Sequence, residues 1–420
     1  MLRHLFCVLL TFQQIFSIHY TFLPVRLRTI MAVFGLCLFI VDSKSFRISR
    51  RYISRFQNLI LCLLLLFVVA LLSIFINNNY DPFFIKFSVT IFISFASAYC
   101  YIKLLRKVLK EDINFSTLIK LFVEACILQC LLSLLIFVIP SFRNLMFGIV
   151  AQSEMDVYTL SLLYHPGEDV LFRFIPVGYN FWLIGTTFAV IIFFLSIISA
   201  KCKEKKQVFL LLLCIFTILI FGACISRTSL IGLPFFLLYI YKSKTISFKT
   251  KHTVYKSFIG LLIIAIIASL FLVEKFPVLE VAFERGFSMF YDYKETEKMP
   301  SVVSMTGEAV VPTDLTTWII GDALMADPED PGASFYKGVD IGFLRIIFGV
   351  GILGLIIYSC VQIILCRLAG FSKNQTFMLF VIYCAFMCKG LFCFDLLLSP
   401  LIMSHFIMAI PNNRNTLIRK

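Results

Sequence analysis

The sequence predicts an all-α polytopic membrane protein, and its composition leads to this class. Hydrophobic residues make up 60% of the 420-residue chain and charged residues only 15%, whereas soluble domains contain roughly 45–50% apolar and about 25% charged residues. The mean hydropathy is +0.94. Because a helix needs about 20 apolar residues to span a bilayer, we expect about twelve transmembrane helices and two enlarged outer loops, all within a single transmembrane domain, 1–420.

Apolar stretches separated by short polar segments define the predicted spans. The first stretch has a basic start and an apolar core but no small-residue cleavage site, so we expect a retained helix rather than a signal peptide. The second, eighth, eleventh and twelfth stretches are short. The spans are predicted near residues 5–22, 29–41, 58–76, 83–102, 117–139, 180–200, 207–225, 228–241, 257–273, 341–365, 377–389 and 396–410.

Lysine and arginine residues predict the orientation of these spans. Basic clusters such as KLLRKVLK (103–110) and KCKEKK (201–206) occupy alternate short loops. Cytoplasmic loops carry an excess of Lys and Arg, and that excess falls on the inside when both termini are cytoplasmic. The net charge of +14 is therefore a topology signal, and we do not expect nucleic acid as a partner.

Two loops on the outer side are long in this topology, and the other connections are short. They cover residues 140–179 and 274–340. Loops of this length are usually functional or disordered, and their many apolar residues argue against disorder. The stretch PVLEVAFERGFSMF (277–290) has apolar residues at helical spacing, which predicts an amphipathic helix within an otherwise acidic second loop. An acidic loop favours a neutral, hydroxyl-rich substrate over a soluble anion.

An arginine interrupts one of the most apolar stretches of the chain. Arg227 lies in the sequence SRTS, within the run from Gln207 to Tyr241. An arginine at the centre of a bilayer costs a few kcal/mol or more, so we expect two helices that turn outward at Arg227, where the side chain reaches water. At such a turn Arg227 is either a snorkelling residue at a helix end or a ligand for an anion.

Arg173 and Arg285 face the same compartment as Arg227 in this topology. Planar guanidinium groups bind phosphate through two parallel hydrogen bonds, so three converging arginines suit a pyrophosphate. The alternative interpretation is that each arginine pairs with a nearby acid, as Arg285 would with Glu280 or Glu284.

The tenth predicted span begins with two charged residues. Asp340 lies where the second loop re-enters the membrane, and Arg345 follows about a turn and a half deeper. A carboxylate beside a cation at the membrane face suits a general base or a group that orients a substrate hydroxyl. Alternatively, Asp340 caps the helix. Four glycines in this span favour close helix packing.

Other chemistry has little support in the sequence. None of the fourteen cysteines lies in either long loop, and the five histidines are scattered along the chain. We therefore expect no disulfide framework, no metal site and no cofactor. A glycine-rich nucleotide-binding loop is also absent.

Three stretches resemble the O-antigen polymerases of the Wzy type, a family of bacterial inner-membrane proteins. FRFIPVGYNFWLIG (172–185) is similar to the arginine and glycine motif that leads out of the family's first periplasmic loop. SRTSLIG (226–232) is similar to its arginine turn. WIIGDAL (318–324), followed by DIGFLRIIFGVGILG (340–354), is similar to the end of its second periplasmic loop. The layout of twelve spans and two enlarged loops covers the whole chain.

This resemblance implies a metal-independent glycosyltransferase that acts on the periplasmic face of the inner membrane. It would join oligosaccharide repeats linked to undecaprenyl pyrophosphate into a polysaccharide, with the bilayer and a chain-length regulator as further partners. Arg173, Arg227 and Arg285 would hold the pyrophosphate leaving group, and Asp340 would be the base. Glu168 and Asp169 are rival carboxylates for that base, and together with Arg345 they are expected to contact the substrate.

Three alternatives remain open from the sequence. An O-antigen ligase shares the architecture but typically uses a histidine in the second loop, and residues 253–404 contain no histidine. A lipid-linked oligosaccharide flippase would need charged residues along a cavity through the membrane, and the predicted spans contain few, among them Lys120, Glu124 and Arg345. A scaffold without activity would leave the long loops unexplained.

Overall fold

The computed structural model of the protein describes most of the chain as helices. It describes residues 1–43, 50–151, 173–178, 180–200, 202, 204–243, 248–275, 310–329 and 335–408. Within these ranges there are no β-strands, only two isolated bridges, Tyr20 to Val150 and Ala326 to Phe335. The predicted all-α class is therefore confirmed.

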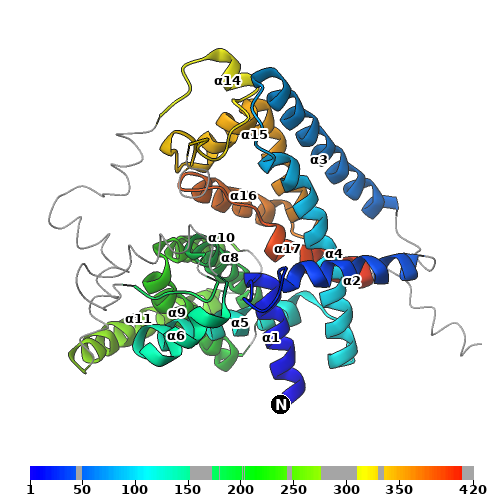
Figure 1. Ribbon diagram of the computed structural model, residues 1–420. Coiled ribbons are helices and arrows are strands. Elements are labelled where there is room, and N and C mark those ends of the chain that lie inside the picture. Colours follow the sequence, from blue (N-terminus) through cyan, green and yellow to red (C-terminus); the bar gives the residue numbers. More distant parts are fainter. Residues whose placement is uncertain are drawn as a thin grey trace, which may run out of the picture. The chain divides into compact units, whose positions relative to one another are not determined.

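A described helix overlaps each of the twelve predicted spans, with different ends (Figure 1). These helices are Leu2–Phe16 (α1), Leu27–Ser43 (α2), Arg50–Asn77 (α3), Phe83–Leu109 (α4), Phe115–Val138 (α5), Phe181–Ser199 (α8), Lys205–Ile225 (α9), Gly232–Lys242 (α10), Phe248–Lys275 (α11), Gly342–Leu368 (α15), Lys373–Met387 (α16) and Asp395–Met408 (α17). Shorter elements in the connections are Pro140–Ile149 (α6), Arg227–Ile231 (η1), Leu315–Ile319 (α14) and Tyr336–Gly338 (η2).

Six of the described helices are long and apolar enough to cross a membrane, and they make this chain a membrane protein. They are Ser54–Asn77, Phe83–Leu109, Phe115–Val138, Phe181–Ser199, Lys206–Ile225 and Gly342–Leu368. The apolar helices α1 and α17 are shorter, at 15 and 14 residues, which is less than the ~20 residues of a full crossing. Twelve membrane crossings therefore stay a prediction.

Local sequence signals explain where several helices begin. The N-cap residue of α8 is Asn180, whose Oδ1 accepts a hydrogen bond from Leu183 N at 2.9 Å. Helix α16 begins with a capping box in which Ser372 and Gln375 bond reciprocally through side chain and backbone. Pro140 occupies the first turn of α6, where its missing N–H costs nothing.

The chain divides into two compact units. Unit 1 comprises residues Met1–Ile15, Val25–Leu118 and Val310–Lys420, and unit 2 comprises Phe16–Pro24 and Ile119–Ala309. Whether the two units form the single transmembrane domain predicted for residues 1–420 is not tested, so that domain stays a prediction.

Unit 1 is built around α4 and α15. Helix α3 packs against α15 and α4, and α17 packs against α4 and α15 (Figure 1). Helix α2 crosses α4 so closely that a Cβ added at Gly35 would collide with the carbonyl of Ala96. Small residues at a helix crossing permit this approach, and α4 supplies them in the sequence SFASA, residues 94–98.

An ion pair is buried inside unit 1, and the sequence did not predict it. Arg28 of α2 and Asp395 of α17 are 8% and 9% exposed, and Arg28 Nη2 lies 3.4 Å from Asp395 Oδ2. Ser94 of α4 donates to the same carboxylate oxygen at 2.5 Å and also accepts from Arg28 Nη2. Three helices that are distant in the sequence therefore meet at one charged cluster.

Unit 2 is built around α8, most of which is buried. Its sequence is apolar on all sides, which is typical of a helix enclosed by neighbours. Helices α9 and α10 pack against it, and a Cβ added at Gly232 of α10 would lie 2.6 Å from the carbonyl oxygen of Ala189. The amphipathic helix predicted over 277–290 lies outside the described residues.

Candidate functional site

Arg173 of unit 2 is held against the end of α9. Its Nη2 donates to the carbonyl oxygen of Ile225 at 2.5 Å, and its guanidinium lies 3.9 Å from the ring centroid of Phe181. One residue further on, Phe174 N donates to Cys224 O at 3.2 Å. The segment before α8 is thereby fixed to the last turn of α9, and Arg173 remains half-buried.

Arg227 lies at the turn that the sequence predicted. Helix α9 ends at Ile225, Ser226 is extended (φ −155°, ψ 119°), and the 3₁₀ helix η1 leads directly into α10. Arg227 is half-buried at the start of η1, two residues after the carbonyl that binds Arg173. The structure thus brings two of the predicted arginines to one turn.

Two glycines allow this turn to pack tightly on its neighbours. A Cβ added at Gly185 of α8 would lie 2.6 Å from Ser226 Oγ and 3.2 Å from Thr228 Cβ. A Cβ added at Gly222 of α9 would lie 3.0 Å from Ser229 Oγ. A side chain at either position would crowd its neighbours, so the glycines let the arginine turn approach α8 and α9 closely.

Arg143 is a third arginine near this end of unit 2, and the sequence reasoning missed it. It is buried in α6, and its Nε and Nη2 donate to the carbonyls of Ile136 and Phe137 at 3.2 and 3.5 Å. The ring centroids of Phe137 and Phe174 are 4.9 Å apart. Cations stabilise helix C-termini, so Arg143 at α5 and Arg173 at α9 share this structural role. The signal was a basic residue directly after a predicted span.

Asp340 and Arg345 of unit 1 form an ion pair at the start of α15. Arg345 Nη2 donates to Asp340 Oδ1, and Arg345 Nε donates to Val339 O at 2.9 Å. The arginine side chain is 8% exposed and the aspartate side chain 72% exposed. The N-cap residue of α15 is Ile341, so Asp340 bonds to Arg345 in place of the capping role considered from the sequence.

A second ion pair lies a few residues before Asp340. Lys337 Nζ lies 3.5 Å from Asp322 Oδ2 and within 5 Å of the ring centroids of Tyr336 and Phe348. Thr317 Oγ1 donates to the other oxygen of Asp322 at 2.5 Å. Burial raises the pKa of Tyr336, and the Asp322 carboxylate raises it further, so the phenol is neutral at neutral pH.

Helix α15 is broken at Val350 and Gly351. These residues have φ −143°, ψ 15° and φ 69°, ψ −176°, which are not helical. Residues 319–323 pack into the break: Asp322 N donates to Phe348 O at 2.5 Å, and a Cβ added at Gly321 would lie 2.6 Å from Val350 N. Ser73 Oγ donates to Gly349 O at 3.1 Å. These bonds replace part of the hydrogen bonding that the break removes.

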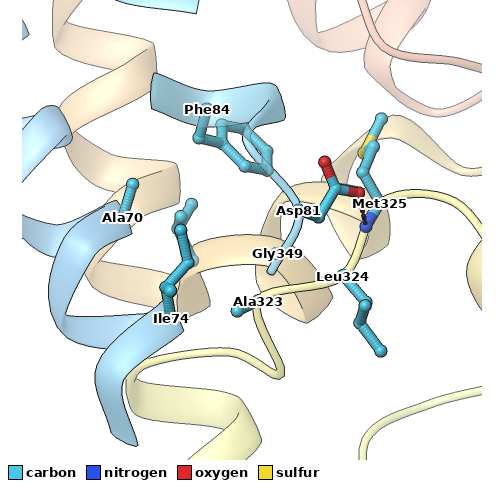
Figure 2. A pocket seen from close by; sticks show the side chains of 9 residues that line it. Ala70, Ile74, Asp81, Phe84, Ala323, Leu324, Met325 and Gly349 are labelled. Carbon is cyan, nitrogen blue, oxygen red and sulfur yellow. Dashed lines mark hydrogen bonds between the residues drawn. The ribbon is translucent and has the colours of Figure 1, made fainter. Parts of the chain in front are cut away.

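The connection between α3 and α4 holds this inserted segment through three polar side chains. Asn77 Nδ2 donates to Gly321 O at 2.8 Å, and Asn79 Nδ2 donates to Asp322 O at 2.9 Å. Asp81 Oδ2 accepts from Met325 N at 2.8 Å, as Figure 2 shows. By length this connection is an ordinary short loop, and its run of polar residues, NNNYD (77–81), is the sequence signal that sets it apart.

A pocket lies beside the break, between α3, α4 and α15 (Figure 2). Its wall includes Asp81, Phe84, Met325 and Gly349, and its empty space is about 190 Å³ including the open mouth. Ligand sites usually measure about 300–1,000 Å³, so this pocket is too small for an oligosaccharide. Asp81 serves there as an acceptor for backbone N–H groups.

The remaining predicted residues, Arg285, Glu168 and Asp169, lie outside the described residues. Within the described part of the chain, no three His, Cys, Asp or Glu side chains are grouped so that they could hold a metal ion. The predicted site residues that are described therefore form two groups: Arg173 with Arg227 in unit 2, and Asp340 with Arg345 in unit 1.

In the part of the chain that the structure describes, the apolar helices define an all-helical membrane protein. No family model, curated protein or solved structure matches this chain.

Proposed function

We propose that the protein is an O-antigen polymerase, a glycosyltransferase that joins undecaprenyl-pyrophosphate-linked repeats on the periplasmic face of the bacterial inner membrane. The observation that carries the proposal is that Arg173 bonds to Ile225 O, two residues before Arg227 at the same turn. Two half-buried guanidinium groups at the ends of apolar helices suit a lipid whose diphosphate lies at the membrane surface.

The proposed reaction forms one glycosidic bond and breaks one bond to the diphosphate. A hydroxyl of the acceptor glycan attacks the anomeric carbon of the donor glycan. The bond between that carbon and the diphosphate oxygen breaks, and the lipid diphosphate leaves with its electron pair. Arg173, Arg227 and Arg285 stabilise the developing charge, and a carboxylate takes the proton of the hydroxyl.

The family resemblance makes Asp340 the proposed base, and within unit 1 its carboxylate is accessible. Its side chain is 72% exposed, and Arg345 fixes one of its oxygens. Arg345 acts as a positioning residue through Asp340. Glu168 and Asp169 remain the rival bases, and the same assay on Asn and Gln variants of all three carboxylates separates them.

Arg227 gives the sharpest test of the proposed site. We expect Arg227→Gln to abolish the O-antigen ladder at normal protein abundance, and Arg227→Lys to restore it only in part, because lysine lacks the bidentate geometry. Charge-assisted hydrogen bonds are worth roughly 1.5–3 kcal/mol each, or about tenfold to a hundredfold in rate. A wild-type ladder in the Arg227→Gln strain would show that Arg227 is only a snorkelling residue.

Deletion of the gene separates the polymerase from its alternatives. Loss of a polymerase leaves single repeats on lipid A core, loss of a ligase leaves polymer on the polyprenyl carrier, and loss of a flippase keeps repeats out of the periplasm. The flippase is the second candidate, because the ion pair of Arg28 with Asp395 is a charged cluster inside an apolar unit.

A further inference from the structure

Two hydroxyl groups in the arginine turn are buried without a hydrogen-bond partner. Thr228 and Ser229 are 3% and 0% exposed, and their side-chain oxygens bond to no atom of the described residues. The large majority of buried side-chain polar atoms are paired, and leaving such a group unpaired destabilises a fold. The two hydroxyls therefore weaken the turn in the state that the structure shows.

Buried hydroxyls on the adjacent helix α8 are of both kinds: Thr187 Oγ1 has no partner among the described residues either, whereas Thr186 and Ser196 show the usual arrangement. Thr186 Oγ1 donates to the carbonyls of Trp182 and Leu183, both at 3.0 Å, and Ser196 Oγ donates to Phe193 O at 2.6 Å. Each of these hydroxyls uses a carbonyl three or four residues earlier in its own helix.

Thr228 and Ser229 do not use this solution. The carbonyls three and four residues earlier are those of Cys224, Ile225 and Ser226, which accept from Phe174 N, Arg173 Nη2 and Ser229 N.

The turn is bounded by close packing on one side and by one extended residue at its start. It packs against Gly185 and Gly222, and it is joined to α9 by the extended residue Ser226.

We propose that Thr228 and Ser229 are further ligands of a diphosphate group bound by Arg173 and Arg227, reached when the turn rotates at Ser226. Hydroxyl groups donate to phosphate oxygens, and hydrogen bonds to an ionised acceptor are stronger than neutral ones. Their pairing with the ligand relieves the cost that they impose on the empty turn. That the diphosphate belongs to a lipid rests on the proposed function. Free pyrophosphate carries the same diphosphate group and would make the same contacts.

The test compares thermal unfolding with pyrophosphate binding in the purified, detergent-solubilised protein. We expect Thr228→Val and Ser229→Ala to raise Tm by about 2 °C, as removal of an unpaired buried hydroxyl should, and to weaken pyrophosphate binding about tenfold. The matched controls Thr186→Val and Ser196→Ala remove paired hydroxyls from α8, so neither should weaken pyrophosphate binding.

The opposite changes in stability and affinity distinguish a ligand role from a structural one. Three results overturn the proposal. The first is unchanged pyrophosphate affinity in both Thr228→Val and Ser229→Ala, and the second is a fall in both Tm and pyrophosphate affinity in these variants. The third is a wild-type protein that binds no pyrophosphate. Thr228→Ser keeps the hydroxyl, so this variant should bind pyrophosphate with wild-type affinity. A tenfold loss of pyrophosphate affinity in Thr228→Ser also overturns the proposal.

Two further measurements separate this inference from the proposed function. The first measurement compares the affinity of the protein for farnesyl diphosphate with its affinity for pyrophosphate. Tighter binding of farnesyl diphosphate identifies a lipid headgroup as the ligand, and equal affinity identifies the free anion. Both results support the site. The second measurement is the O-antigen ladder of a deletion strain, and an intact ladder refutes the proposed polymerase function. The proposed anion site would still be supported in that case if pyrophosphate binding depends on Thr228 and Ser229.

Discussion

At the residue scale, the buried pair of Arg28 and Asp395 has the largest expected effect on the stability of unit 1. Both side chains are almost fully buried, and Ser94 bonds to both of them. The loss of one partner leaves the other charge buried and unpaired, which typically costs about 3–5 kcal/mol. An exposed ion pair typically contributes about 0–1 kcal/mol.

We therefore expect Asp395→Asn to lower the thermal midpoint of the protein strongly and to reduce its accumulation in the membrane. The matched control is Asp112→Asn, because Asp112 pairs with Arg106 at 2.5 Å while its side chain is 67% exposed. A thermal unfolding scan of both variants in detergent measures the difference. Equal midpoints for Asp395→Asn and Asp112→Asn would contradict the assignment of a buried charge pair.

Single residues were predictable from the sequence where their context was unusual. Arg227 stood out because apolar residues surround it, and it lies at a helix–helix turn as expected. Arg28 and Asp395 stood at the edges of predicted spans, where a charge normally costs little, so nothing in the sequence indicated their pairing. The carbonyl that Arg173 binds depends on the packing of α8 against α9, which no local pattern specifies.

At the element scale, the break in α15 is the feature that depends most clearly on one residue type, a glycine at position 351. Gly351 adopts φ +69°, a conformation that favours glycine, and a Cβ there would collide with the carbonyl of Ile319. Its role is thus both conformational and steric. It lets residues 319–323 enter the helix and bond to its exposed backbone.

We expect Gly351→Ala to destabilise unit 1 by several kcal/mol, because the backbone strain of about 1 kcal/mol adds to a collision with the main chain. Gly338→Ala is the control, since Gly338 has a similar φ of +66° but nothing within 4 Å of an added Cβ. Thermal midpoints of the two variants compare the crowded position with the open one. A loss in Gly351→Ala no larger than in Gly338→Ala would refute the close insertion.

The helices themselves followed from length and hydropathy, because apolar runs in a bilayer must satisfy their backbone internally. The break did not follow. Gly349 and Gly351 were interpreted as packing residues, which is what glycines in such a span usually are. The partners that stabilise the break, Asn77, Asn79 and Gly321, lie far away in the sequence, so their pairing could not be predicted from a local pattern.

At the scale of the whole molecule, the alternation of basic loops and apolar helices predicts the topology. Helix α8 packs against both α9 and α10, and the short connections between these helices fit successive crossings. In the predicted orientation, the arginine turn and the start of α15 face the periplasm, which is the side where the proposed substrates lie.

Reporter fusions test that orientation directly. A reporter enzyme fused after residue 300 should have periplasmic activity, and one fused after residue 248 should have cytoplasmic activity, because basic loops stay inside. Fusions after residues 110 and 206, which follow two further basic clusters, serve as cytoplasmic controls. The reverse result at residue 300 or 248 would overturn the orientation and the proposed periplasmic site with it.

The division of unit 1 along the chain sets the timing of its assembly during synthesis. Asn77 meets Gly321 across 244 residues, and the intervening chain consists mainly of unit 2. At about 5–20 residues per second, a ribosome needs roughly 12–50 s to make this stretch. During that interval the amides of Asn77 and Asn79 must be hydrated or held by a chaperone. Unit 2, which is nearly continuous, can fold in the meantime, and a chain that stops before residue 310 lacks the partners of Asn77 and Asn79.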